Sequence, residues 1–176
     1  MPEPEAAPPR IAVFAPRGRS ADLLTQRIAS LGAEAEVVMT AEVLAHRLEG
    51  LETLSRPWDA LVVMFEELGS ADALTALTKA LRRQPSWSAL PVLACASDLR
   101  VFDDELGADL LAVPGVRPIL RPVAWSVLGA RLERALAERT RQYRVREAIA
   151  ELEAARATSE AHASDLERAT RDRKST

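Results

Sequence analysis

The chain has 176 residues, of which 48% are hydrophobic and 28% charged, and its formal net charge is −3. A chain of this length can bury one sizeable core, and so small a net charge gives no general attraction to nucleic acid. The basic residues are spread along the chain without interleaved aromatic residues, so we expect no nucleic-acid partner.

Residues 1–10 are rich in Pro, Ala and Glu, and we expect them to form a disordered lead-in. Five short apolar runs then predict β-strands. The run from Trp58 to Glu67 is the most continuous and rich in β-branched residues, which indicates a strand buried on both faces of a parallel sheet. The predicted strands lie within residues 11–15, 34–39, 58–67, 91–96 and 116–120.

Segments with leucine or isoleucine at helical spacing follow the first four strands. Ser20, Thr40 and Ser70 are the predicted N-caps of the first three helices. The fourth segment, 97–113, gives a weaker helical pattern, because Gly107 lowers helix stability by about 1 kcal/mol relative to alanine.

The alternation of strands and helices predicts an α/β fold, a three-layer flavodoxin-like (βα)5 sandwich with the parallel strand order 2-1-3-4-5. Pro118 supports this order. Proline cannot donate to a ladder on both sides, so the strand that contains it should lie at the edge of the sheet.

After Pro122 the composition changes to Ala, Glu, Arg and Leu, and residues 123–173 predict one helix of about 50 residues, about 75 Å long. We expect a receiver-like domain at 11–138, and a coiled-coil connector with a frayed end at 139–176. Apolar residues at heptad spacing, interrupted by Arg156 and Ser159, favour a parallel homodimer. The predicted dimer interface is Trp125, Leu128, Leu132, Val145, Ile149, Leu152 and Leu166.

Three short motifs mark the ends of the strands: Trp58-Asp59 opens the third, Leu90-Pro91-Val92 opens the fourth, and Arg121-Pro122 closes the fifth. In this the chain resembles, over about residues 10–137, the receiver domain of two-component response regulators. It also looks like the receiver-like modules that precede sensor and histidine-kinase domains in bacterial signalling proteins.

The resemblance implies a phosphorylation site that this sequence does not complete. In the family, acids after strand one bind Mg²⁺, an aspartate ends strand three, a Thr or Ser ends strand four, and a lysine precedes a proline after strand five. The matching positions form a degenerate phosphoacceptor pocket, because a thioether flanked by Pro and Arg is neither a nucleophile nor a ligand for a hard cation. These positions are Pro16, Arg17, Met64, Ala96 and Arg121.

Glu66 and Glu67 follow the expected phosphoacceptor position by two and three residues, and two interpretations stay open. In the first, one of the two glutamates pairs with Arg17 or Arg121 and substitutes permanently for the phosphorylated state. In the second, both glutamates are solvated loop acids. An active phosphoacceptor at Glu66 or Asp59 is a further alternative.

The expected function is that of a non-enzymatic pseudo-receiver, without cofactor or metal, that acts by homodimerisation and by contact with a signalling protein such as a histidine kinase. The lone Cys95 has no disulfide partner in the chain, and no apolar run approaches about 18 residues, so we expect a cytoplasmic protein without direct membrane contact. The alternative is a sensor that binds an anionic small molecule at the helix-opening turn Arg17-Gly18-Arg19-Ser20.

Overall fold

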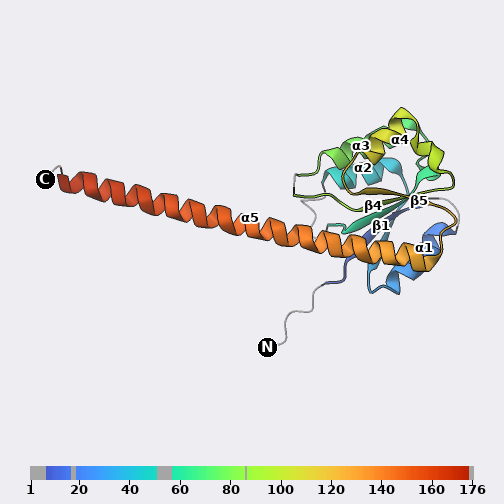
Figure 1. Cartoon of the computed structure of the whole chain (residues 1–176), viewed down its shortest axis with the longest axis horizontal. Helices are drawn as coiled ribbons and strands as arrows, with labels where there is room; N and C mark the ends of the chain where they lie inside the picture. The colour runs from blue at the N-terminus through green and yellow to red at the C-terminus, as the bar shows by residue number, and fades with distance from the viewer. Residues whose placement is uncertain (1–6, 17–18, 51–56, 86, 175–176) are drawn as a thin grey trace. The chain divides into compact units, whose positions relative to one another are not determined.

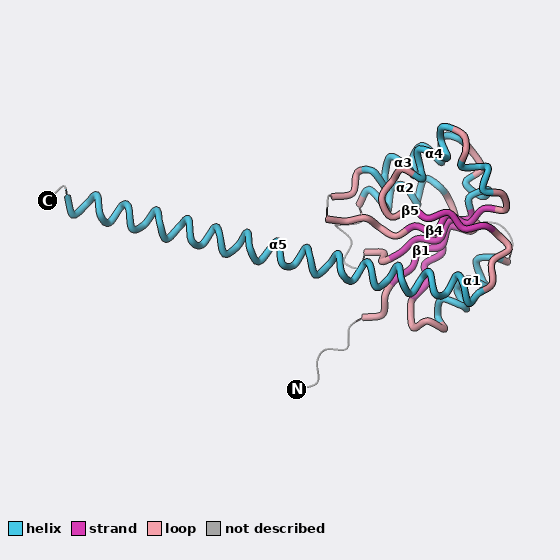
Figure 2. Tube along the Cα trace, in the orientation of Figure 1, coloured by secondary structure: helices cyan, strands magenta, loops and turns pink. Residues whose placement is uncertain are grey.

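The computed structural model describes residues 7–16, 19–50, 57–85 and 87–174, and describes side chains as far as residue 162. Five parallel strands form one sheet in the order β2-β1-β3-β4-β5, which confirms the predicted fold class and strand order (Figures 1 and 2). Pro118 lies in the edge strand, as predicted. The strands are β1 (Arg10–Phe14), β2 (Glu34–Val38), β3 (Ala60–Met64), β4 (Val92–Ala96) and β5 (Val116–Leu120).

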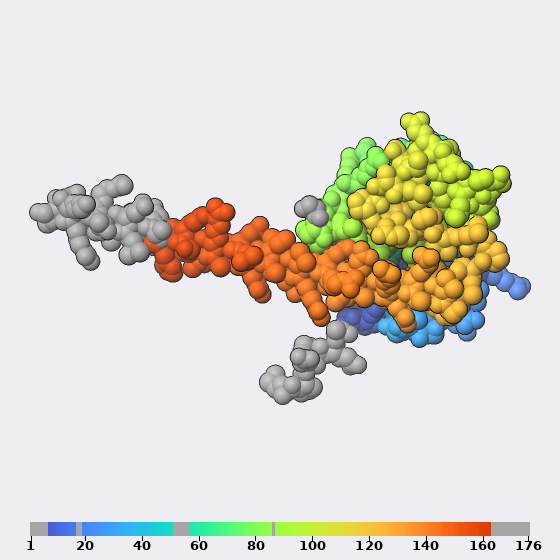
Figure 3. Space-filling view, viewed as in Figure 1, coloured from blue at the N-terminus to red at the C-terminus, as the bar shows by residue number. Residues whose placement is uncertain are grey.

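The sheet separates two hydrophobic cores. On one face lie α1 (Ser20–Ala29) and the first turns of α5 (Trp125–Lys174), which adjoin in the space-filling view (Figure 3). On the other face lie α2 (Ala41–Glu49), α3 (Ala71–Arg82) and α4 (Glu105–Leu111). Successive residues of β3 enter these two cores alternately, and all five are buried, as expected for a central parallel strand.

Two of the three predicted N-caps are confirmed. Thr40 accepts a hydrogen bond from the backbone N–H of Val43 at 3.3 Å, and Ser70 accepts one from that of Ala73 at 3.1 Å. Ser20 is instead the first residue of α1, and Arg19 occupies the N-cap without a side-chain hydrogen bond. The prediction for Ser20 was therefore wrong by one residue.

The single helix predicted over 97–113 is wrong. The segment forms a 3-10 helix, η2 (Leu99–Phe102), and then α4, and each has its own aspartate cap, Asp98 and Asp104. Gly107 is buried where α4 crosses η2, and a Cβ there would lie 2.5 Å from the Cα of Phe102. The glycine thus permits a close backbone approach that any side chain would block.

The chain divides into two compact units, Met1–Thr140 and Arg141–Thr176, and α5 begins in the first. Arg139, which the sequence assigned to the connector, is 2% exposed within the first unit. It donates to the Ser88 hydroxyl at 2.7 Å, and its guanidinium carbon lies 5.6 Å from the ring centroid of Trp87. The structural boundary therefore falls two residues after the predicted one.

In the part of the chain that the structure describes, no helix combines the length and the apolar composition needed to cross a membrane.

Candidate functional site

The predicted pocket residues lie at the carboxyl ends of neighbouring strands. Met64 ends β3, Ala96 ends β4, and Arg121 directly follows β5. Met64 is 4% exposed and its Cα pairs with that of Cys95. Pro16 is half-buried after β1, and Arg17 lies outside the described residues. Where the resemblance implies a reactive carboxylate, the sheet therefore presents two sulfur-containing side chains.

The chain leaves β3 through a 3-10 helix, η1 (Phe65–Leu68), and not through the longer strand that the sequence predicted. Phe65 packs against Phe102, with ring centroids 4.6 Å apart. Gly69 then turns the chain at a φ of 76°, in the left-handed region that favours glycine. This short turn places Glu66 above the ends of β4 and β5.

Glu66 connects the ends of these two strands. One carboxylate oxygen accepts a hydrogen bond from the Ser97 hydroxyl at 2.6 Å and another from the Ser97 backbone N–H. The other oxygen lies 2.6 Å from Nη2 of Arg121, in a salt bridge whose side chains are 33% and 31% exposed. Of the two interpretations of the acids after β3, the structure supports pairing for Glu66.

The environment of Glu66 keeps it ionised. Partial burial raises its pKa, but hydrogen bonds from the Ser97 hydroxyl, the Ser97 N–H and Arg121 to the ionised form outweigh that effect and lower the pKa to about 2. Burial raises the pKa of the neighbouring Cys95 thiol to about 11, because it outweighs the opposing effect of the Arg121 charge, and the Glu66 charge adds to the increase. The site therefore carries a fixed carboxylate and a neutral thiol near pH 7.

Ser97 contacts Glu66 and was not among the predicted pocket residues. The strand-four hydroxyl position was assigned to Ala96, which ends β4 and is buried, whereas the hydroxyl that contacts Glu66 comes one residue later. A serine directly after a buried strand was the available signal.

Asp59, the other acid considered as a phosphoacceptor, lies before the first residue of β3, at the opposite end of that strand from Met64. Its carboxylate accepts a hydrogen bond from the backbone N–H of Arg10 at 2.8 Å. This position assigns Asp59 a structural contact between β1 and β3.

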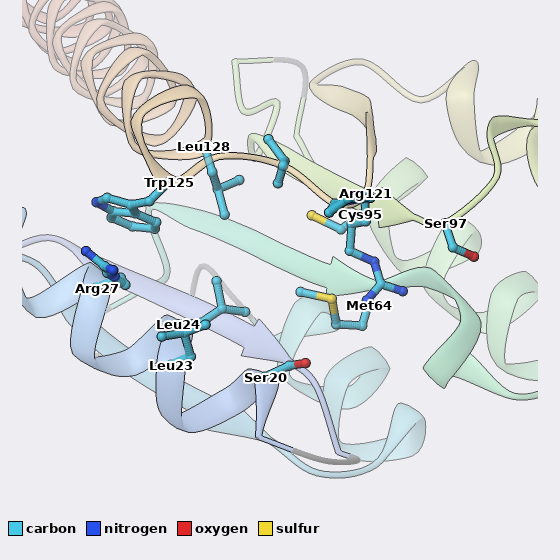
Figure 4. Close-up of a pocket in the computed structure, with 12 residues that line it drawn as sticks. Ser20, Leu23, Leu24, Arg27, Met64, Cys95, Ser97, Arg121, Trp125 and Leu128 are labelled. Atoms are coloured by element: carbon cyan, nitrogen blue, oxygen red, sulfur yellow. The ribbon is translucent and has the colours of Figure 1, made fainter.

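A cavity of about 560 Å³ adjoins this site on the α1 and α5 face of the sheet, where Met64 and Arg121 contribute to its lining (Figure 4). Two residues of the turn predicted to bind an anion are described, Arg19 and Ser20, and of these Ser20 lines the cavity. Arg19 is exposed, and Arg17 and Gly18 lie outside the described residues. Within the described ranges, no group of three or more His, Cys, Asp or Glu side chains is placed to hold a metal ion.

The residues predicted for the dimer interface divide into two groups. Leu128 and Leu132 are 5% and 0% exposed in the core between α1 and the sheet, so their apolar spacing reflects packing within the chain. Trp125 is partly buried against the same core. On the second unit, three predicted residues are exposed: Val145, Ile149 and Leu152. The side chain of Leu166 lies outside the described ones.

No protein-family model and no curated protein matches the chain. Solved structures do match. A CheY-like response regulator receiver domain from Methylobacillus flagellatus is 18% identical, with a TM-score of 0.55 over 73% of this chain and 98% of that one. A CheY-like receiver domain protein from Methanospirillum hungatei JF-1 is 15% identical, with a TM-score of 0.58 over 77% and 98% of the two chains. A sensor protein from Polaromonas sp. JS666 is 25% identical, with a TM-score of 0.54 over 74% and 98%.

These likenesses cover nearly the whole of each matched structure, and they accompany the observed sheet order β2-β1-β3-β4-β5. The chain therefore has the fold of the response regulator receiver domains.

Proposed function

We propose that this chain is a non-enzymatic pseudo-receiver of two-component signalling, in which Glu66 permanently takes the place of a phosphoryl group. The observation that carries this proposal is the contact of one carboxylate with both Ser97 and Arg121. In the receiver domains that the sequence resembles, a hydroxyl ends strand four and a lysine follows strand five; here Ser97 supplies a hydroxyl one residue later and Arg121 keeps the positive charge.

The chemistry of the strand ends supports the proposal. Phosphoryl transfer to a receiver needs a nucleophilic carboxylate and oxygen ligands for Mg²⁺. Met64 offers a thioether at the first position, and Pro16 offers no side-chain oxygen at the second. Glu66 is already engaged by two partners, and its low pKa keeps the negative charge that a phosphoryl group would carry.

The output of such a module is contact with other proteins. We propose that it homodimerises through the exposed apolar residues of the second unit, and that it regulates a cytoplasmic signalling partner such as a histidine kinase or a following output domain. Val145, Ile149 and Leu152 are exposed at heptad spacing on a helix, which is the pattern that a coiled coil buries.

The test is to incubate the chain with acetyl phosphate and Mg²⁺, and separately with beryllofluoride and Mg²⁺, and to record intact mass and amide NMR spectra. We expect no added phosphoryl mass and no shift of the Ser97 amide in either case. A phosphoryl adduct on Glu66, Asp59 or any other acid would overturn the proposal. The variant Glu66→Ala, which frees Ser97 and Arg121, is expected to shift the Ser97 amide without any added reagent.

A further inference from the structure

The cavity of about 560 Å³ is lined by residues of α1 and of the first turns of α5, and it shares Ser97 and Arg121 with the contact of Glu66. Its volume falls within the range of sites that bind small molecules. Met64 and Cys95 line it from the ends of β3 and β4, and Leu24, Trp125 and Leu128 line it from the helices (Figure 4). These side chains would contact the apolar body of a ligand.

The two charged side chains that line the cavity are arginines, and one of them, Arg121, is paired with Glu66. Arg27 and Arg121 both line it, and no Asp or Glu is among its described lining residues. Figure 4 shows Arg27 beside Trp125 and Arg121 toward Met64, from different elements of the fold. The guanidinium carbon of Arg27 lies 6.0 Å from the ring centroid of Trp125, and none of the described carboxylates forms an ion pair with Arg27. This arrangement favours an anion.

Arg121 has a donor to spare. Its Nη2 holds Glu66, whereas its Nε is buried and, among the described residues, has no hydrogen-bond partner. Buried donors of this kind are rare in folded proteins, so the guanidinium of Arg121 keeps hydrogen-bonding capacity that Glu66 does not use. The nearby Cys95 thiol, with its pKa raised to about 11 by burial, stays neutral near pH 7 and does not repel an anion.

We propose that this cavity binds an apolar monocarboxylate, with its hydrocarbon body against Leu24, Trp125 and Leu128 and its carboxylate on the guanidinium of Arg121. Arg27, which is exposed on α1, attracts the anion at the mouth of the cavity. The site does not depend on the proposed role of Glu66, because neither the cavity nor the free donor requires the chain to be closed to phosphorylation.

Calorimetric titration of the full-length chain with decanoate, below its micellar concentration, tests the proposal. We expect saturable one-to-one binding, about tenfold weaker binding of decanol, and none of decyltrimethylammonium. A second titration, with 3-phenylpropanoate, tests which apolar body the cavity prefers. Tighter binding of decanoate indicates a ligand with an acyl chain, and tighter binding of the aromatic acid indicates a ligand with a ring. Failure of both acids to bind the folded chain would overturn the proposal.

Matched arginine variants test where the ligand binds. Arg27→Gln and Arg121→Gln should each weaken binding about tenfold, while Arg19→Gln, on an exposed arginine outside the cavity lining, should leave it within twofold. Leu23 is 56% exposed at the cavity, so Leu23→Trp can obstruct it without disturbing the core and should abolish binding. Equal weakening by Arg19→Gln and Arg27→Gln, or unchanged binding to a folded Leu23→Trp variant, would show that the acid binds elsewhere.

Discussion

Oε2 of Glu66 lies 2.6 Å from Nη2 of Arg121, a residue 55 positions further along the chain. The contact joins the turn after β3 to the end of β5. Glu66→Gln keeps an acceptor for Ser97 but removes the charge that Arg121 faces. Because the pair is about one-third exposed, we expect the free energy of unfolding to fall by about 1 kcal/mol. Urea unfolding measures the change, and Glu133→Gln, on an exposed residue of α5, should leave stability unaltered.

The low pKa of Glu66 predicts a pH dependence of the same contact. A carboxyl whose pKa is lowered by folding contributes stability above its unfolded value, near 4.5, and loses that contribution as the pH falls toward 2. The shift alone corresponds to about 3 kcal/mol, and we expect about 1 kcal/mol because solvent screens this exposed pair. The stability difference between the natural chain and Glu66→Gln should therefore stay constant above about pH 5 and disappear between pH 4.5 and 2. A difference that grows on acidification would contradict the assignment.

We expect substitution by alanine to change the stability of the fold in opposite directions at two helical glycines. At Gly107 a Cβ would lie 2.5 Å from backbone atoms of η2, and we expect Gly107→Ala to destabilise the fold by about 2 kcal/mol despite its better helix propensity. At Gly129 the nearest atom would be in the Trp125 ring, at 3.5 Å, an ordinary contact. Gly129→Ala should therefore stabilise by up to about 1 kcal/mol. Thermal unfolding of both variants shows whether the close backbone contact or the helix propensity decides the stability at each position.

Because Arg139 is buried near the end of the first unit, we expect its substitution to lower the stability of the fold strongly. Arg139→Ala removes the hydrogen bond to Ser88, the contact with the Trp87 ring and the packing of the side-chain stem. We expect it to cost about 2 kcal/mol. Arg141→Ala, two residues later on an exposed position, should change stability by less than about 0.5 kcal/mol, and similar losses for the two variants would refute the role of Arg139.

Dimerisation is tested on one face of the second unit. Ile149 is 44% exposed at a predicted core position of the coiled coil, and Ala150 is its exposed neighbour outside that seam. We expect light scattering at tens of micromolar to give a dimer for the natural chain and for Ala150→Glu, and a monomer for Ile149→Glu and for a chain that ends at Thr140. A monomeric natural chain would exclude this mode of action.

The sheet could be predicted because its signals are local. Runs of apolar residues as short as β3 define buried strands, and Pro118 identifies the edge without knowledge of any distant residue. The split of the fourth helical segment was also visible in principle, since Asp98 and Asp104 are two N-cap residues in one predicted helix.

The partners of Glu66 and the burial of α5 could not be predicted, because they depend on contacts between residues that are distant in the sequence. Glu66 meets partners 31 and 55 residues away, and only the register of β3, β4 and β5 brings them together. Leu128 and Leu132 show the same spacing that an interface would show, because an apolar stripe on a helix satisfies either a sheet or a second helix. Sequence periodicity alone cannot distinguish these two kinds of burial.

The alternation of β3 between two cores gives the molecule an internal pair of reporters. Val62 and Val63 are adjacent in sequence and fully buried, yet Val62 belongs to the core under α1 and α5, and Val63 to the core under α2, α3 and α4. An event confined to one face would change the methyl NMR signals of one valine more than those of the other. The two neighbouring residues thus offer a way to tell which side of the sheet a binding partner acts on, before that partner has been located.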